Sequence, residues 1–329
     1  MKNNNEKFFF IGILIGGTIL FSAVNFQRFI ALSDPNQKNP YTLTPSDNLP
    51  RLLALEPTKV IEQATQQVIT ATAEIESTTT PAKATFTSTA TPLYLANEQE
   101  PEIIGNSMNG LPLEVYTFGS GEHKRMIVAG IHGGDEWNTV TLANQLITYI
   151  AQYPDIVPDD VKLYVLRNLN PDGEARAHNK NGRLNSNGVD LNRNFPANWQ
   201  ADWNRAGCWN YLPSSSGSEA GSEPETRALM GFIESHNIEA LISYHSAALG
   251  IFPGGEPWDE NSIRFAESIA EVSSYPFPPI DTSCSYTGTL ADYAVAKRIV
   301  AVDLELTNHI DTDFDTNLNI LEILLTFQP

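Results

Sequence analysis

Cysteine is scarce in this 329-residue chain, which contains only Cys208 and Cys284. Neither lies near the N-terminus, so no cysteine there could carry a lipid anchor. In an exported chain the two could form one disulfide. Their spacing alone does not show that they meet, so the sequence leaves open a disulfide or two free thiols.

Basic residues are also few, with 20 Lys and Arg against 39 Asp and Glu, which gives a formal net charge of −19. The pI near 4.6 follows from this imbalance. A chain so acidic is repelled by nucleic acid and by anionic lipid surfaces. We therefore expect no nucleic-acid partner, and membrane contact only through the N-terminal segment.

An uncharged and mostly apolar run extends from Phe8 to Val24 and follows Lys2 and Lys7. Its 17 residues are at the short limit for a membrane-spanning helix and slightly long for the core of a signal peptide. Either interpretation, a membrane anchor or a signal peptide, predicts that the chain is exported. We favour an uncleaved anchor over a cleaved signal in residues 1–32, with a cytoplasmic N-terminus and an extracellular remainder, secreted or tethered.

Residues 33–100 are rich in Thr, Ser, Pro, Ala and Gln, most densely in 77–92. Such a segment has too little apolar surface to offset its ordering entropy, so we predict a disordered linker, a candidate for O-glycosylation. A single catalytic domain is expected in 101–329, as a monomer. We see no sign of a folded inhibitory segment before Ile103.

The remaining sequence predicts an α/β domain. Residues 103–119 form two β-like runs around Asn109-Gly110, a hairpin signal. Unbroken apolar runs, typical of parallel strands buried on both faces, occupy 125–131, 161–166, 240–244 and 299–306. Helical periodicity marks 138–150, 222–237 and 316–327, the second opening with Ser222 and Glu225 in capping-box spacing. This alternation predicts a mixed, largely parallel central β-sheet with helices on both faces.

Three polar residues fall where predicted strands end: His132, His245 and Glu305. In open α/β sheets the ligand crevice lies beyond the carboxyl ends of the strands, so these residues are expected to share one rim. Two imidazoles and a carboxylate, with one position open to water, suit a catalytic zinc ion. Such an ion polarises a carbonyl and activates water, and a separate carboxylate must move the proton. Glu305 is the best-placed carboxylate for that task.

A polar stretch, residues 168–196, follows one core strand and should overhang the same crevice as a loop. It contains Arg183, Asn192 and Arg193. Because arginine matches a carboxylate bidentately and can steady an oxyanion, these residues fit a site that holds a substrate terminus.

Taken together, the chain resembles the zinc carboxypeptidases of the carboxypeptidase A type, peptidase family M14. The resemblance rests on HGGDEW (132–137), NPDG (170–173), GVDLNRNF (188–195), SEPET (222–226), SYHS (243–246) and DLEL (303–306), in the family's order. It implies a zinc carboxypeptidase-like, phosphorylase/hydrolase-like fold and one Zn²⁺ ion. It further implies that the zinc ligands are His132, Glu136 and His245 and that the general base is Glu305. By the same resemblance Arg183 stabilises the oxyanion, and Asn192 and Arg193 bind the terminal carboxylate of the substrate.

The chain departs from the family pattern in places. The family places two residues between its first histidine and glutamate, whereas three lie between His132 and Glu136 here, so Asp135 occupies the usual offset. We favour Glu136 as the ligand, with Asp135 as the alternative. For the tyrosine that covers the substrate we favour Tyr286 over Tyr293.

The floor of the specificity pocket is expected near residues 287–292. Asp292 would favour a basic terminal residue if it faced that pocket, although we expect a structural role for it. We expect no metal-binding role for the four remaining histidines, His123, His178, His236 and His309.

These observations predict an exported zinc metallocarboxypeptidase that removes residues from the free carboxyl end of a peptide. One alternative is the same chemistry on a peptidoglycan stem peptide of the D-glutamyl-diaminopimelate type. A second alternative is a tethered peptide-binding module without catalysis.

Overall fold

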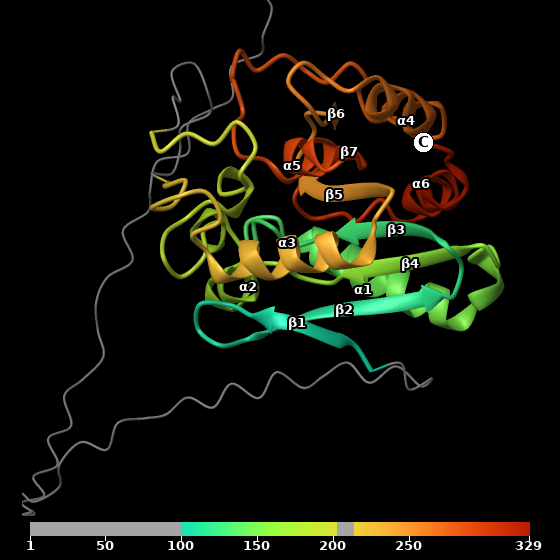
Figure 1. Cartoon of the computed structure of the whole chain (residues 1–329), viewed down its shortest axis with the longest axis horizontal. Helices are drawn as coiled ribbons and strands as arrows, with labels where there is room; N and C mark the ends of the chain where they lie inside the picture. The colour runs from blue at the N-terminus through green and yellow to red at the C-terminus, as the bar shows by residue number, and fades with distance from the viewer. Residues whose placement is uncertain (1–99, 203–213) are drawn as a thin grey trace, which may run out of the picture. The chain divides into compact units, whose positions relative to one another are not determined.

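The computed structural model describes residues 100–202 and 214–329 (Figure 1). The predicted anchor, nearly all of the predicted linker and Cys208 lie outside these residues, so the anchor, the linker and the disulfide with Cys284 stay predictions. Within the described ranges, no helix is both long enough and apolar enough to cross a membrane.

A mixed sheet runs through the described domain in the strand order β1-β2-β4-β3-β5-β7-β6 (Figure 1). Its strands are β1 (Glu102–Asn106), β2 (Pro112–Gly119), β3 (His123–Val128), β4 (Val161–Leu166), β5 (Ala240–Ser246), β6 (Ile251–Pro253) and β7 (Val300–Leu306). The central strands β4, β3, β5 and β7 are parallel, whereas β1 and β2 pair antiparallel at one edge and β6 at the other. The predicted largely parallel sheet is thereby confirmed.

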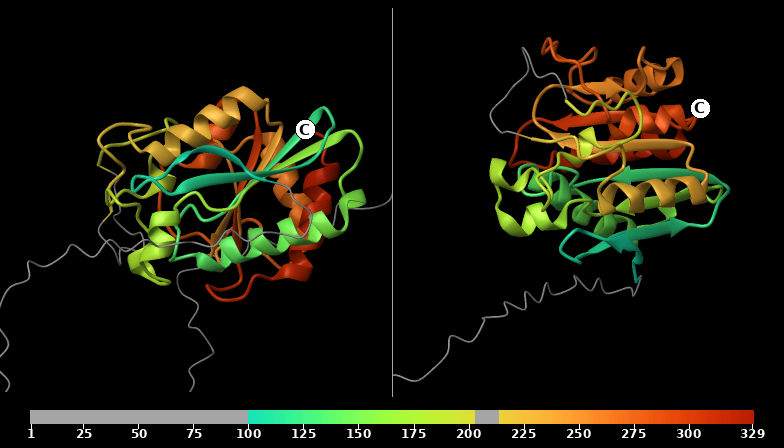
Figure 2. Two further views of the ribbon diagram at one scale, coloured as in Figure 1. Left: turned by 90° about the horizontal axis from the view of Figure 1, so that it is seen from below. Right: turned by 60° about the vertical axis from the view of Figure 1, so that its left-hand side comes forward.

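The helices cover both faces of this sheet, as predicted. The main helices are α1 (Trp137–Gln152), α3 (Pro224–His236), α4 (Glu260–Glu271), α5 (Leu290–Ala296) and α6 (Phe314–Thr326). Buried side chains of α1, α4 and α6 belong to one apolar cluster, and those of α3 and α5 belong to a second. Figure 2 shows α1 and α3 on opposite sides of the strands. Each fully buried Leu or Ile stabilises the fold by roughly 1.5–3 kcal/mol.

Local sequence signals explain several element boundaries. The Asn109-Gly110 turn joins β1 to β2, and Gly110 has a positive φ of 86° that suits glycine. Helices α1, α3 and α6 lie within two residues of the ranges expected from periodicity. Short helical turns, α2 (Pro171–Arg176), η2 (Lys180–Gly182) and η3 (Leu191–Arg193), break up the stretch that we expected to be a plain loop.

Two local expectations are wrong. The capping box of α3 does not form: Ser222 Oγ donates to the Glu223 carboxylate at 2.6 Å, and Glu225 is buried, where it accepts from the Met108 amide. Strand β3 ends at Val128 rather than Ile131, because the chain turns at Gly130, where φ is 65°.

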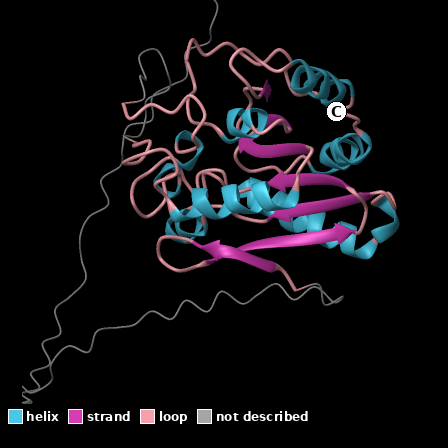
Figure 3. Cartoon of the chain, viewed as in Figure 1, coloured by secondary structure: helices cyan, strands magenta, loops and turns pink. Residues whose placement is uncertain are grey.

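Figure 3 shows long loops gathered beyond the arrowheads of the parallel strands. The site described next lies at this end.

Candidate metal centre

His132 and Glu136 lie on one tight turn between β3 and α1. Gly133 has a φ of 46°, and a Cβ on Gly134 would lie 1.9 Å from the Ala177 carbonyl oxygen. The two glycines therefore let the turn pack against residues 170–182, and they accommodate the longer spacing. Glu136 precedes the first residue of α1, so the helix fixes where its carboxylate begins.

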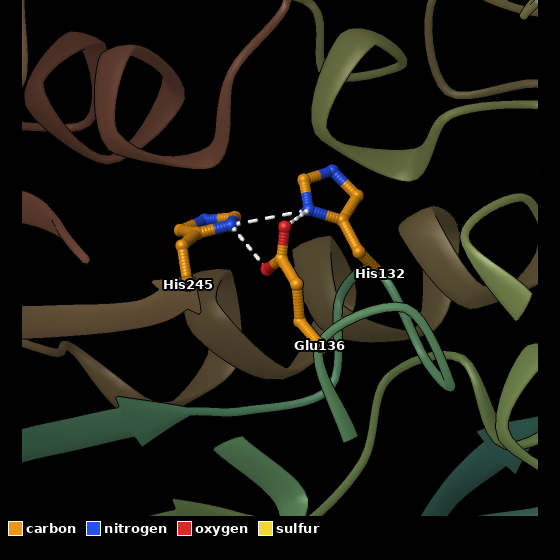
Figure 4. A group of neighbouring side chains, drawn as sticks. All are labelled: His132, Glu136 and His245. Atoms are coloured by element: carbon orange, nitrogen blue, oxygen red, sulfur yellow. Dashed lines mark hydrogen bonds and ion pairs between the residues drawn. The ribbon is translucent and has the colours of Figure 1, made fainter. Parts of the chain in front are cut away.

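His245 reaches the same point from β5, the strand next to β3. Its Nδ1 atom lies 3.2 Å from Nδ1 of His132 and 3.1 Å from Oε2 of Glu136. Oε1 of Glu136 lies 2.7 Å from Nδ1 of His132. All three side chains are buried, and Figure 4 shows them converging from separate parts of the chain. The predicted ligands thus form a possible metal site.

The geometry fits a zinc ion. Two nitrogens that are each about 2.0–2.1 Å from a tetrahedral zinc lie about 3.3 Å apart, close to the 3.2 Å between the two Nδ1 atoms. Asp135, the alternative ligand, is not in this group, and its carboxylate instead lies 3.7 Å from Nη1 of Arg183. The carboxylate that joins the histidines is that of Glu136.

The far ring nitrogens of both histidines have partners of their own. Nε2 of His132 lies 3.0 Å from Oδ1 of Asp190, and Nε2 of His245 lies 3.0 Å from Oγ of Ser243. A ring N–H donated to such a partner leaves the Nδ1 lone pair free for a metal. Sequence reasoning missed Asp190, although it lies in the quoted GVDLNRNF motif.

Ionisable groups of opposite charge lie close together at this site. Burial raises the pKa of Glu136, but His132 and His245 more than offset burial and hold it well below its usual range. Burial lowers the pKa of His245, yet Glu136 and Asp303 raise it to about 10. A ring nitrogen must be deprotonated to bind a metal, so ion binding at this site would compete with protonation of His245.

Glu305 stands beside the cluster on β7, where it is the register partner of His245. Its Oε2 atom is buried and has no hydrogen-bond partner among the described residues. Burial raises the pKa of Glu305 to about 8, and the charge of Glu136 adds to this effect. A carboxyl group with a raised pKa beside a metal site is suited to proton transfer.

Arg183 lies against the cluster. Its guanidinium donates to Oε1 of Glu136 at 3.1 Å, and Asp190 also accepts from it. Arg193 is buried in the same cavity, with its guanidinium 4.9 Å from the ring centre of Tyr286. Asn192 donates to Oδ2 of Asp303 at 3.1 Å.

The predicted site residues line one cavity of about 990 Å³. Tyr286 is on its wall, whereas Tyr293 is buried in the core and donates to Glu234 at 2.9 Å. The preference for Tyr286 is consistent with this arrangement. Asp292 also lines the cavity and accepts from the Gly255 amide at 2.8 Å, so it faces the pocket and has a structural contact as well.

The four remaining histidines do not join a metal-binding group among the described residues. His178 stacks on Trp137 at 5.1 Å, and His236 stacks on Phe232 at 3.9 Å. His123 lies 3.1 Å from Glu239. His309 lines the cavity, with its ring 3.1 Å from Oγ of Ser246.

Comparisons with known proteins agree with this geometry. Murein peptide amidase A of Escherichia coli K12 is 34% identical over 151 residues, which cover 44% of this chain and 58% of that protein. The carboxypeptidase N catalytic chain of Homo sapiens is 28% identical over 220 residues, which cover 56% of this chain and 46% of that protein. This chain thus spans about half the length of these curated relatives.

A solved structure is also similar to this chain. The crystal structure of murein-tripeptide amidase MpaA from Escherichia coli O157 matches with a TM-score of 0.53 and 26% identity, and the match covers 70% of this chain and 93% of that chain. The family model for zinc carboxypeptidases, peptidase M14, matches residues 95–315, which is more than half of the sequence. The chain therefore belongs to the M14 zinc carboxypeptidase family of peptidases.

Proposed function

We propose that this protein is a zinc-dependent carboxypeptidase that hydrolyses the amide bond next to a free terminal carboxylate. One observation carries the proposal: the metal-ligand group, a carboxyl group with a raised pKa and a buried arginine line the same cavity. The first two suit hydrolysis. The arginine suits a substrate with a carboxylate at its end.

His132, Glu136 and His245 would hold the ion. When bound, zinc supplies a Lewis acid that polarises the scissile carbonyl and lowers the pKa of water. Asp190 and Ser243 orient the two rings through their far nitrogens. The protein's own contribution is a set of ligand atoms that lie within 4.8 Å of one another.

Glu305 moves the proton in this proposal. It accepts a proton from the attacking water as the new carbon–oxygen bond forms, and it returns that proton to the leaving nitrogen as the carbon–nitrogen bond breaks. Arg183 lies against the ligands and stabilises negative charge that develops on the carbonyl oxygen. Arg193 and Asn192 hold the terminal carboxylate, and Tyr286 covers it.

The experiment is a comparison of matched peptides that end in a free carboxylate or in an amide. We expect cleavage of the free peptide, loss of the last residue as the product, and full inhibition by a chelator that zinc reverses. Equal cleavage of the amidated peptide, or cleavage at internal bonds, would overturn the exopeptidase proposal.

A second candidate is the same reaction on a peptidoglycan stem peptide. It is favoured by the similarity to murein peptide amidase A and to the murein-tripeptide amidase structure, which this chain covers to 93%. Arg193 would then hold the carboxylate of a diamino acid. Purified muropeptides assayed beside ordinary peptides distinguish the two substrates, because only one series should show product.

Both candidates are proposed to act outside the cell, with the chain exported by its N-terminal segment. Fractionation of cells that express the full chain tests this, and the protein in the soluble cytoplasmic fraction would contradict it.

A further inference from the structure

His309 lines the cavity but has no part in the reaction proposed above. It is an exposed residue of the loop that follows β7, residues 307–313. Nδ1 of its ring lies 3.1 Å from Oγ of Ser246, the residue directly after the proposed ligand His245. Nε2 has no hydrogen-bond partner among the described residues. One nitrogen of this ring is therefore available to a molecule that occupies the cavity.

The neighbours of His309 decide which ring nitrogen carries the proton. The side-chain amide of the buried Asn138 donates to the carbonyl oxygens of Asn308 and Asp311 at 2.7 and 2.9 Å, so its Oδ1 atom is the acceptor. Ser246 donates its single hydroxyl proton to that Oδ1 atom at 3.0 Å. Oγ of Ser246 can then only accept from His309, so this hydrogen-bond network assigns the proton to Nδ1. In the neutral ring Nε2 then holds a lone pair and accepts hydrogen bonds.

The loop that carries His309 is held in place by hydrogen bonds of its own. The Asp313 carboxylate accepts from the backbone amide and from the hydroxyl of Thr307, both at 2.9 Å. Oδ1 of Asn308 accepts from the backbone amides two and three residues after it, at 2.7 and 2.8 Å. Because Asn138 also ties this loop to α1, a contact with the His309 ring orders little additional chain, which lowers the entropy cost of binding.

The place of this loop in the fold indicates which part of a substrate it meets. Asn138, which binds the loop, is the second residue of α1. Asn192, a proposed carboxylate-binding residue, accepts from the first amide of α5, that of Leu290, at 2.8 Å. Helices α1 and α5 belong to apolar clusters on opposite faces of the sheet, and His245 comes from the sheet itself. A substrate with its terminal carboxylate toward α5 and its scissile carbonyl at the metal ligands therefore extends toward α1 and His309 on its acyl side.

We propose that His309 is a substrate-binding residue whose Nε2 atom accepts a hydrogen bond from the N–H group nearest to the scissile carbonyl on the acyl side. The inference rests on the proposed carboxypeptidase function, which assigns the terminal carboxylate to Arg193 and Asn192. It adds a recognised group on the other side of the scissile bond. A substrate whose acyl part ends in a hydroxy acid lacks this N–H group and is expected to be cleaved less efficiently.

The test uses the zinc-loaded full chain and two substrates that differ at one position. In the second substrate an ester oxygen replaces the acyl-side N–H group, so the donor is removed and the shape is kept. We expect kcat/KM for release of the terminal residue to be about 3- to 10-fold higher with the N–H group, the range for one neutral hydrogen bond.

The pair is made once with an ordinary peptide bond and once with a γ-glutamyl bond, because the N–H group lies further from the scissile carbonyl in the second. A preference in either series supports the inference, and equal kcat/KM values in both overturn it. That result leaves the carboxypeptidase proposal intact if amidated peptides are still resistant. Cleavage of amidated peptides at the same rate overturns the carboxypeptidase proposal instead.

Two variants locate the preference. His309→Ala should lower kcat/KM for the N–H substrate by about 3- to 10-fold and leave that for the ester nearly unchanged, so that the ratio approaches one. Ile310→Ala removes a side chain that is 71% exposed from the same loop and should keep the ratio. An unchanged ratio in His309→Ala, or the same loss of preference in both variants, would overturn the assignment.

The position of the proton can be measured on the unmodified protein, without a substrate. Nitrogen NMR of the zinc-loaded full chain, at a pH high enough to leave the ring neutral, should show His309 protonated at Nδ1 and unprotonated at Nε2. The signals are assigned by their loss in His309→Ala. A neutral His309 ring protonated at Nε2 would overturn the inference, because Nε2 would then have no lone pair to offer a substrate.

Discussion

Glu305 on β7 is paired in register with His245 on β5. Paired residues on neighbouring parallel strands project from the same face, so the sheet holds the proposed base beside a proposed ligand. The two roles are separable by mutation, because Glu305 does not belong to the group whose atoms converge within 4.8 Å.

Replacement of Glu305 should therefore stop proton transfer and spare the metal. We expect Glu305→Gln to lower kcat by about 10²- to 10⁴-fold, with zinc content unchanged when measured by atomic absorption. Glu260→Gln, an exposed position at the start of α4, is the matched control and should behave like the unmodified protein. Loss of zinc from Glu305→Gln would show that it is a ligand.

Asp135 and Glu136, which lie on the same turn as His132, should differ in their effect on zinc affinity. Glu136→Ala removes a contact to both histidines, so we expect zinc affinity to fall by at least about tenfold in competition with a chromophoric chelator. Asp135→Ala should bind zinc like the unmodified protein, because the Asp135 carboxylate lies against Arg183 instead. The reverse order would favour Asp135 as the ligand.

Asp190 should affect the zinc affinity of the site without being a zinc ligand. Its carboxylate fixes the His132 ring through Nε2, and loss of such a partner usually costs about 10- to 100-fold in metal affinity. We expect Asp190→Asn to show this loss in the same competition assay. Asp160→Asn, an exposed position before β4, should show none. Equal zinc affinity in both variants would remove Asp190 from this role.

Arg193 should contribute to substrate binding through the terminal carboxylate. We expect Arg193→Ala to lower kcat/KM by about 10²-fold, mainly through KM, for peptides with a free carboxyl end. Arg227→Ala, at an exposed position on α3, is the control. A fall in kcat at unchanged KM would place Arg193 in the chemical step instead.

Stability at acidic pH should depend on Glu239. Nη1 of the fully buried Arg125 donates to it at 2.7 Å. Burial raises the pKa of Glu239, but hydrogen bonds from Arg125 and His123 more than offset burial and hold it below its usual range. A lowered pKa means that the stabilisation is fully present above the unfolded-state pKa and is lost as pH falls through the folded-state pKa.

We expect Glu239→Gln to lower the free energy of unfolding by about 1 kcal/mol at pH 7, a modest value because the Glu239 side chain is 35% exposed. The difference should be smaller at pH 3.5 than at pH 7, because the unfolded-state carboxylate is then largely protonated and the pH is closer to the lowered folded-state pKa. Urea unfolding at both pH values measures it, with Glu122→Gln as an exposed control. A difference that grows toward pH 3.5 would contradict the sign.

Much of the domain could be predicted because its signals are local. Unbroken apolar runs mark the parallel strands, since a strand buried on both faces has no polar side to show. The Asn109-Gly110 turn and helix α1 each depend on residues that are close together in the sequence, so a local pattern is enough to predict them. The capping box of α3 failed because tertiary contacts to Met108 outweigh the local preference for Glu225 at the helix start. Helices α4 and α5 were missed.

The residue types and their order along the chain established the family resemblance and the ligand candidates, because these are properties of the sequence itself. Only the tertiary structure distinguishes the positions of residues between which the sequence left a choice. A tight turn directs Glu136 toward the histidines and Asp135 toward Arg183, and helix α5 buries Tyr293 while Tyr286 stays on the cavity wall. The role of Asp190 likewise depends on a distant side chain, that of His132, and only the folding of the sheet and its loops brings the two together.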